Sequence, residues 1–216
     1  MNPSLKLFLA LIISLEISLK ANLWANLIVI TCCIIYLIFH QIKLKTFLLL
    51  LAIPLLAAFA MFSSIYWSSS GQNVIYAWVL FTRIYVFVFA GACVTQTMTI
   101  NELVRSLEQN FKLPSKFAYG ILAAFNVIPK IKEEVRRIQV AGEMRGLYLS
   151  FWSPRLYFKA ILAAINWADG LAQGMSSHGY HENMPRSIIK PISLTKKDWS
   201  IFIAILLIFQ PILFLL

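Results

Sequence analysis

FNVIPKIKEEVRRIQVAGEMRGLYLSFWSPRLYFKAILAAINWADGLAQGMSSHGY, residues 125–180, is the stretch that decides how this chain is organised. It carries too many charges for a membrane span and too many apolar residues for a simple loop. Its periodicity predicts one helix from about Lys130 to Arg145 and a second from about Pro154 to His178. A glycine, the usual left-handed helix terminator, follows each helix at Gly146 and Gly179.

Both predicted helices therefore end on a triplet with a basic or potentially basic residue in its middle. The first triplet is Met144-Arg145-Gly146, and the second is Ser177-His178-Gly179. Arg145 and His178 each continue an apolar stripe with three- and four-residue spacing, so they are predicted to lie where a packing face ends. The stripes are Ile128, Ile131, Val135, Ile138 and Gly142 in the first helix, and Ala160, Ala164, Trp167, Leu171 and Gly174 in the second.

The rest of the first helix is predicted to face solvent. Lys130 with Glu134, and Glu133 with Arg137, form four-residue charge pairs worth roughly 0.2–0.5 kcal/mol each. Gly142 and Gly146 in one helix, and Gly170 and Gly174 in the other, have the spacing that lets helix backbones approach closely. This spacing favours a crossing of the two helices.

The overall composition is that of a membrane protein. Hydrophobic residues make up 60% of the chain, charged residues 13%, and the mean hydropathy is +0.76. Fourteen of the nineteen Lys and Arg residues lie between Arg105 and Lys197. This clustering is typical of a cytoplasmic segment of a membrane protein, so the net charge of +10 does not predict nucleic-acid binding.

Five apolar runs predict an all-α, polytopic protein with about five transmembrane helices: 5–19, 23–39, 47–62, 74–94 and 199–216. Lys43 and Lys45 lie between the second and third runs, whereas the linker Ser63 to Asn73 has no charge. Placing the basic segments inside gives a cytoplasmic N-terminus and an outward C-terminus. Residues 1–98 are predicted to form the N-terminal transmembrane helices, 99–198 a cytoplasmic domain, and 199–216 the last transmembrane helix.

Arg83 is predicted to lie inside the fourth span, where an unpaired arginine costs ~2.5 kcal/mol or more. One interpretation is a fixed polar contact that holds the bundle or a partner. The other is an intrachain pair, with Glu16 as the candidate. Further along, a short amphipathic helix is predicted from Arg105 to Lys112, with Asn101 as its N-terminal cap.

The motifs of several enzyme classes are missing. The chain has no phosphate-binding Gly-x-x-x-x-Gly-Lys-Ser/Thr motif, and no Ser, His and Asp set stands out. Cys32, Cys33 and Cys93 lie in apolar runs without metal-ligand spacing, and the interpretation is inert packing. We therefore expect a non-catalytic subunit with no cofactor and no resident metal.

The order and spacing of these features resemble one family. The features are the Pro-Lys-Ile-Lys-Glu-Glu helix (Pro129 to Glu134), the two triplets, and the upstream Arg83, Thr95–Thr99 and Leu113-Pro114. Together they resemble the transmembrane T component of energy-coupling factor (ECF) importers, including CbiQ-like subunits of cobalt transporters. The resemblance covers roughly Leu80 to Tyr180. The family usually has Arg in the second triplet, where this chain has His178.

The resemblance implies a role and a set of partners. Residues 99–198 would be a coupling-helix domain in which Met144, Arg145, Gly146, Ser177, His178 and Gly179 contact two ABC ATPase subunits. The chain would transmit ATP-driven movement to one substrate-binding S component, in the cell membrane of a prokaryote and surrounded by lipids. The substrate would be a vitamin, a vitamin precursor or a transition metal. The alternative is a membrane scaffold that docks cytoplasmic partners without ATP-driven transport.

Overall fold

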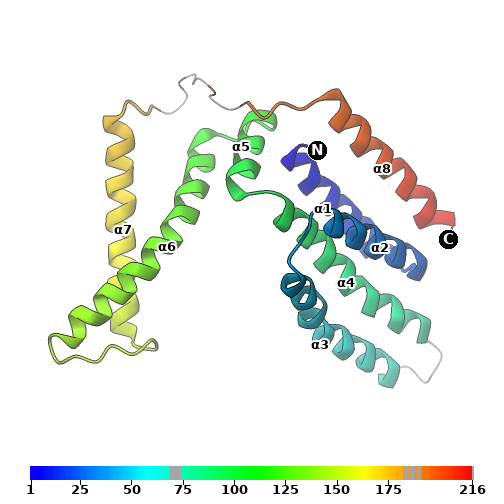
Figure 1. Cartoon of the computed structure of the whole chain (residues 1–216), viewed down its shortest axis with the longest axis horizontal. Coiled ribbons are helices and arrows are strands. Elements are labelled where there is room, and N and C mark those ends of the chain that lie inside the picture. Colours follow the sequence, from blue (N-terminus) through cyan, green and yellow to red (C-terminus); the bar gives the residue numbers. More distant parts are fainter. Residues whose placement is uncertain (69–73, 182–183, 185–187, 189–190, 216) are drawn as a thin grey trace. The chain divides into compact units, whose positions relative to one another are not determined.

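All the regular secondary structure in the described part of the chain is helical. The computed structural model describes residues 1–68, 74–181, 184, 188 and 191–215, which form eight α-helices and no strand (Figure 1). The helices are α1 (Pro3–Leu19), α2 (Leu23–Phe39), α3 (Leu44–Ser68), α4 (Val74–Thr97), α5 (Ile100–Asn110), α6 (Ser115–Glu143), α7 (Pro154–Ser177) and α8 (Lys196–Leu215). The all-α prediction is confirmed, and each of the five apolar runs is helical in its described part.

Helix length and composition support a membrane protein. Among the described residues, Leu44–Trp67 and Val74–Thr97 are long and apolar enough to cross a bilayer, and α2 is a shorter apolar helix. The count of five spans stays a prediction. Parts of the predicted charge-free linker and of the basic connection before α8 lie outside the described residues.

The contacts divide the chain into two compact units, which we describe separately. The bundle unit contains Met1–Asn110 and Ile192–Leu216, and the hairpin unit contains Phe111–Pro191. The predicted boundaries at residues 98 and 198 refer to placement at the membrane, which the division into units does not address.

Helix α4 is the centre of the bundle unit, where it contacts α1, α2 and α3. Val86 of α4 packs with residues of α1, α2 and α8, and Phe89 packs with residues of α2 and α3. Within a bilayer, apolar contact alone gives helices little driving force to associate, so hydrogen bonds between them matter. The buried Asn26 amide of α2 donates to the Val79 carbonyl at 3.1 Å and to the Thr82 hydroxyl at 3.0 Å.

A buried polar cluster joins three segments at one end of this bundle. The Ser106 hydroxyl of α5 donates to the Asn2 side-chain oxygen just before α1. The Asn110 amide donates to the Ile192 carbonyl at 3.0 Å, and the Ile192 amide donates to the Gln109 side chain at 2.7 Å. The start of α1, helix α5 and the segment before α8 are thereby held together.

The short amphipathic helix begins earlier than the sequence predicted. Helix α5 starts at Ile100, and its cap is Thr99 rather than Asn101, which lies inside the helix. The Thr99 amide donates to the Glu102 carboxylate at 2.9 Å, and the Glu102 amide donates to the Thr99 hydroxyl at 3.3 Å. This reciprocal capping box satisfies two backbone donors, whereas Asn101 lies two positions later, inside the helix.

The hairpin unit consists of α6 and α7, which pack against each other (Figure 1). Helix α7 begins at Pro154, as predicted. Helix α6 begins at Ser115 rather than at the predicted start, about Lys130. Pro129 therefore lies inside the helix and not before its start. Proline removes one helical N–H, and a long helix can tolerate this loss at a position such as Pro129, which is exposed to solvent.

Candidate functional site

The end of α6 is fixed by a pair of backbone hydrogen bonds. The Gly146 amide donates to the Glu143 carbonyl, and the Leu147 amide donates to the Gly142 carbonyl, both at 2.9 Å. Gly146 has φ +72°, the left-handed conformation that glycine adopts without a steric penalty. This combination is the Schellman motif, and it places Arg145 immediately before the left-handed residue.

The end of α7 has the same geometry. The Gly179 amide donates to the Ser176 carbonyl at 3.0 Å, and the Tyr180 amide donates to the Met175 carbonyl at 2.9 Å. Gly179 has φ +78°. His178 therefore occupies the position at the end of α7 that Arg145 occupies at the end of α6. The prediction that left-handed glycines end both helices is confirmed.

The side chains at these two helix ends are available for contact. Arg145 and His178 are exposed, and Met144 beside Arg145 is 84% exposed. Within the described part of the chain, neither Arg145 nor His178 has a hydrogen-bond or ion-pair partner from its side chain. Ser177 turns back, and its hydroxyl donates to the Gly174 carbonyl at 2.9 Å. The two helix ends thus present a guanidinium and an imidazole to whatever approaches them.

The predicted stripes are only partly the less exposed faces of the two helices, because Ile128 and Leu171 within them are 48% and 44% exposed. Ile131, Val135 and Ile138 of α6 are half-buried, as are Ala164 and Trp167 of α7, where Ala160 is buried. The Lys130 ammonium lies 5.9 Å from the centre of the Trp167 ring, which is within the range of a cation–π contact. Helices α6 and α7 pack against each other, so the hairpin is one structural piece.

The paired glycines of α6 and α7 do not bring the two helices into a close crossing, which is what their spacing suggested. A Cβ at Gly142 would lie 2.8 Å from the Leu149 side chain and 3.0 Å from the Leu147 carbonyl, both in the chain that follows α6. A Cβ at Gly170 or Gly174 would have no neighbour within 4 Å. Gly142 therefore makes room for its own returning loop, and these glycines do not mark a close crossing of α6 and α7.

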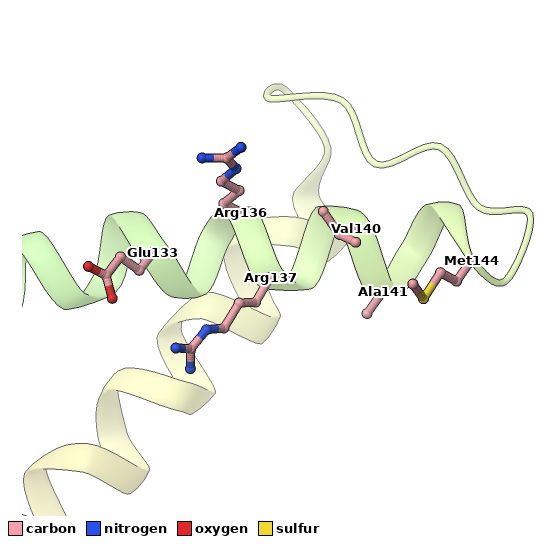
Figure 2. Close-up of a pocket in the computed structure, with 6 residues that line it drawn as sticks. All are labelled: Glu133, Arg136, Arg137, Val140, Ala141 and Met144. Carbon is pink, nitrogen blue, oxygen red and sulfur yellow. The ribbon is translucent and has the colours of Figure 1, made fainter.

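A shallow depression of about 470 Å³ lies along α6 just before its end (Figure 2). Arg136 and Arg137 extend to different sides of the helix there, and Met144 lies at the end of the labelled residues nearest the loop. Arg137 makes an ion pair with Glu134 at 3.7 Å, three residues away, in place of the predicted pair with Glu133. The residues that line the depression are Glu133, Arg136, Arg137, Val140, Ala141 and Met144.

Sequence reasoning missed the exposed loop between the two helices. Tyr148 and Trp152 are each 85% exposed, and Phe151 is 63% exposed. The Phe151-Trp152 pair beside Pro154 was the available signal, but aromatic residues in an apolar chain are read as packing residues. Clusters of exposed aromatic residues are typical of contact surfaces.

Arg83 has an intrachain partner, although not the predicted one. Its guanidinium donates to the Lys20 carbonyl at 3.1 Å, directly after α1, and its Nε atom is buried without a partner. Glu16 instead accepts a hydrogen bond from the Gln210 amide of α8 at 2.7 Å. A cation at the C-terminal end of a helix is favourable, and Arg83 therefore ties α4 to the end of α1.

Over the described ranges, no group of three or more His, Cys, Asp and Glu side chains is arranged to hold a metal ion. The three cysteines, at positions 32, 33 and 93, are free thiols. The Cys93 thiol contacts the Cys33 carbonyl at 3.8 Å, which joins α4 to α2.

One family model matches this chain. The cobalt transport protein family CbiQ matches residues 1–188, and the chain therefore belongs to this family. No curated protein matches it. The predicted resemblance to CbiQ-like T components is confirmed, and family membership identifies a transport-related membrane component rather than an enzyme.

Proposed function

We propose that this chain is the transmembrane T component of an ECF-type ABC importer, and that the two helix ends of the hairpin unit couple it to two ATPase subunits. The observation that carries the proposal is the matched pair of Schellman ends, which expose Arg145 and His178 at equivalent positions. A single exposed basic residue at a helix end needs no partner. Two such ends on one helical hairpin are suited to engage two similar grooves.

The chemistry of each end indicates what its groove contains. A guanidinium presents five donors in a planar fork that matches a carboxylate, so Arg145 suits an acidic groove. The nearby Met144 and the depression along α6 add apolar contact beside that charge. Helix-dipole stabilisation of Arg145 alone would contribute only ~0.3–1 kcal/mol and would not require exposure of its neighbour Met144.

The hairpin is the element that would carry movement. Because α6 and α7 pack against each other, a force applied at either helix end would move both helices together. ATP-driven closure of the ATPase pair would shift the hairpin and reorient an S component that holds the substrate. In this mechanism ATP hydrolysis takes place on the partner subunits, and the present chain binds no nucleotide.

The remaining parts of the proposal concern the membrane and the substrate. We place α1, α2, α3, α4 and α8 across the cell membrane of a prokaryote, with residues 99–198 on the cytoplasmic side. A vitamin, a vitamin precursor or a transition metal would be the substrate. The family name favours cobalt among these.

The test is charge reversal at Arg145. Reversal of one partner in a close charge pair costs about 2–5 kcal/mol, which is on the order of 30-fold or more in affinity. We therefore expect Arg145→Glu to lose most ATPase subunits in co-purification and to abolish substrate uptake in proteoliposomes. Arg145→Lys keeps the charge without the fork, and it should retain part of both.

Arg155→Glu is the matched control. Arg155 is exposed in the first turn of α7, where an acidic residue is favourable, so this variant should bind and transport as wild type does. Full uptake by a well-expressed Arg145→Glu variant would refute the coupling role. If Arg145→Glu lost the ATPase subunits but the wild-type complex showed no ATP-dependent uptake, the alternative of a docking scaffold would hold instead.

A further inference from the structure

The bundle unit contains a cavity that the coupling role does not use. It has a volume of about 500 Å³ and lies between α1, α2, α4 and α8. One wall is a single face of α8, formed by Ile201, Ile205, Ile208 and Ile212. Val29 of α2 and Ala90 of α4 belong to the facing walls, and the lining is almost entirely apolar.

The length of this cavity matches half of a bilayer. Ile201 and Ile212 are eleven residues apart on α8, which corresponds to ~16 Å at the helical rise of ~1.5 Å per residue. The hydrocarbon core of a bilayer is ~30 Å thick, so one leaflet is about 15 Å deep. An extended acyl chain occupies that depth.

One end of the cavity carries a positive charge. The Lys6 ammonium lines it, donates to the Thr97 hydroxyl at 3.3 Å and lies 5.7 Å from the centre of the Tyr36 ring. Lys6 lies in the first turn of α1, whereas Tyr36 and Thr97 lie near the ends of α2 and α4, so these groups gather at one end of the bundle. An ammonium has three donors, and a lysine at a membrane boundary directs them to the interface.

We propose that this cavity binds one acyl chain of an anionic phospholipid whose phosphate pairs with Lys6. The apolar walls have too few polar groups to hold ordered water, which needs two to four partners. A helix of another protein, about 10–12 Å in diameter, is wider than a cavity of this volume and length accepts. An acyl chain fits the walls, and its phosphate complements the charge at the mouth.

This inference rests on the proposed membrane placement of the bundle unit but not on the coupling role of Arg145. The experiment uses the full chain in lipid nanodiscs that contain a photoactivatable phosphatidylglycerol with a diazirine on its acyl chain. After irradiation, peptide mapping by mass spectrometry locates the labelled residues. We expect label on the cavity face of α8.

Two pairs of variants make the result specific. Ile205→Trp fills the cavity and should lose most of the label, whereas Ile203→Trp should keep it, because Ile203 does not line the cavity and lies roughly 200° around the same helix from Ile205. Lys6→Gln should weaken retention about fivefold, the factor that corresponds to about 1 kcal/mol for one basic residue near an anionic surface. Lys45→Gln, in the exposed first turn of α3, should change nothing.

Each contrary outcome overturns the proposal or one of its parts. Equal labelling of the Ile205→Trp and Ile203→Trp variants would show unspecific contact with bulk lipid. Equal retention of a phosphatidylcholine probe would refute the selection of an anionic headgroup. Loss of the label on assembly with partner subunits would assign the cavity to a protein. Arg145→Glu should keep the label, so a failure of coupling and a failure of lipid binding are distinguishable.

Discussion

Replacing either terminal glycine by alanine should open its helix end without touching the basic residue beside it. Gly146 and Gly179 have φ values of +72° and +78°, and an added Cβ would meet no atom within 4 Å at either position. The cost therefore comes from the backbone alone, about 1–2 kcal/mol for a non-glycine residue in left-handed conformation. That energy corresponds to roughly a 5- to 30-fold larger open population.

The measurement is amide hydrogen exchange of the full chain in nanodiscs. In the wild type, the Leu147 amide is bonded to the Gly142 carbonyl and the Tyr180 amide to the Met175 carbonyl. In Gly146→Ala, exchange at Leu147 should accelerate by about 5- to 30-fold, the ratio that follows from the backbone cost. Gly179→Ala should do the same at Tyr180. If the proposed coupling is correct, uptake should also fall, although Arg145 and His178 are unchanged.

Three other glycines provide the controls. Gly170→Ala and Gly174→Ala meet no atom within 4 Å and lie inside α7, so each should stabilise the helix by about 0.5–1 kcal/mol. Gly142→Ala should also destabilise, but by crowding against Leu149 and the Leu147 carbonyl. If Leu147 exchanged no faster in Gly146→Ala than in Gly170→Ala, the left-handed turn would not be what holds this helix end.

Three further predictions test other parts of the molecule. Arg145→Ala should reduce uptake more than His178→Ala, and His178→Arg should retain uptake; a greater loss with His178→Ala would reverse the ranking. Ser106→Ala removes several buried hydrogen bonds that join α5 to the start of α1, so it should lower the free energy of unfolding by about 1–3 kcal/mol in thermal unfolding. The exposed Ser63→Ala should cost less than about 0.5 kcal/mol, and equal losses would contradict the role of the buried cluster. Hydrogen bonds from the Thr99 amide and hydroxyl lower the pKa of Glu102, so the stability that they give to α5 is present above the ordinary glutamate pKa and is lost as the pH falls through the lowered one. A spin label at Asn101 should therefore gain mobility in acid, and Glu102→Gln should remove this pH dependence.

Features encoded within a few residues were predictable from the sequence. The left-handed glycines and the positions of Arg145 and His178 follow from a local rule, because the Schellman motif is closed by backbone bonds within six residues. Helices α1 to α4 and α8 of the bundle could also be predicted, because each of them coincides with one of the five apolar runs. Lipid-facing and core-facing sides of a membrane helix are both apolar, so a run can be recognised without knowing its neighbours.

Features that depend on distant partners were not predictable. The sequence suggested Glu16 as the partner of Arg83, but the backbone carbonyl of Lys20 accepts its hydrogen bond. Every residue has a backbone carbonyl, so no residue pattern predicts which one Arg83 contacts. Gly142 has the spacing of a helix-crossing motif, yet it accommodates Leu149 from the loop that follows it. The cavity near Lys6 is formed by four helices and has no signature in any one of them.

The two helix ends differ in chemistry while they agree in backbone geometry, and this difference constrains the proposed partners. Because both ends are closed by the same bonds, the backbone presents Arg145 and His178 in the same way. Any difference in their effect then comes from the side chains or from the grooves that receive them. Arg145 offers five donors and a permanent charge, whereas the imidazole of His178 offers at most two donors. Two ATPase grooves of similar shape but unequal acidity would suit this pair, and the end of α7 would rely more on the packing of neighbours such as Met175 than on charge.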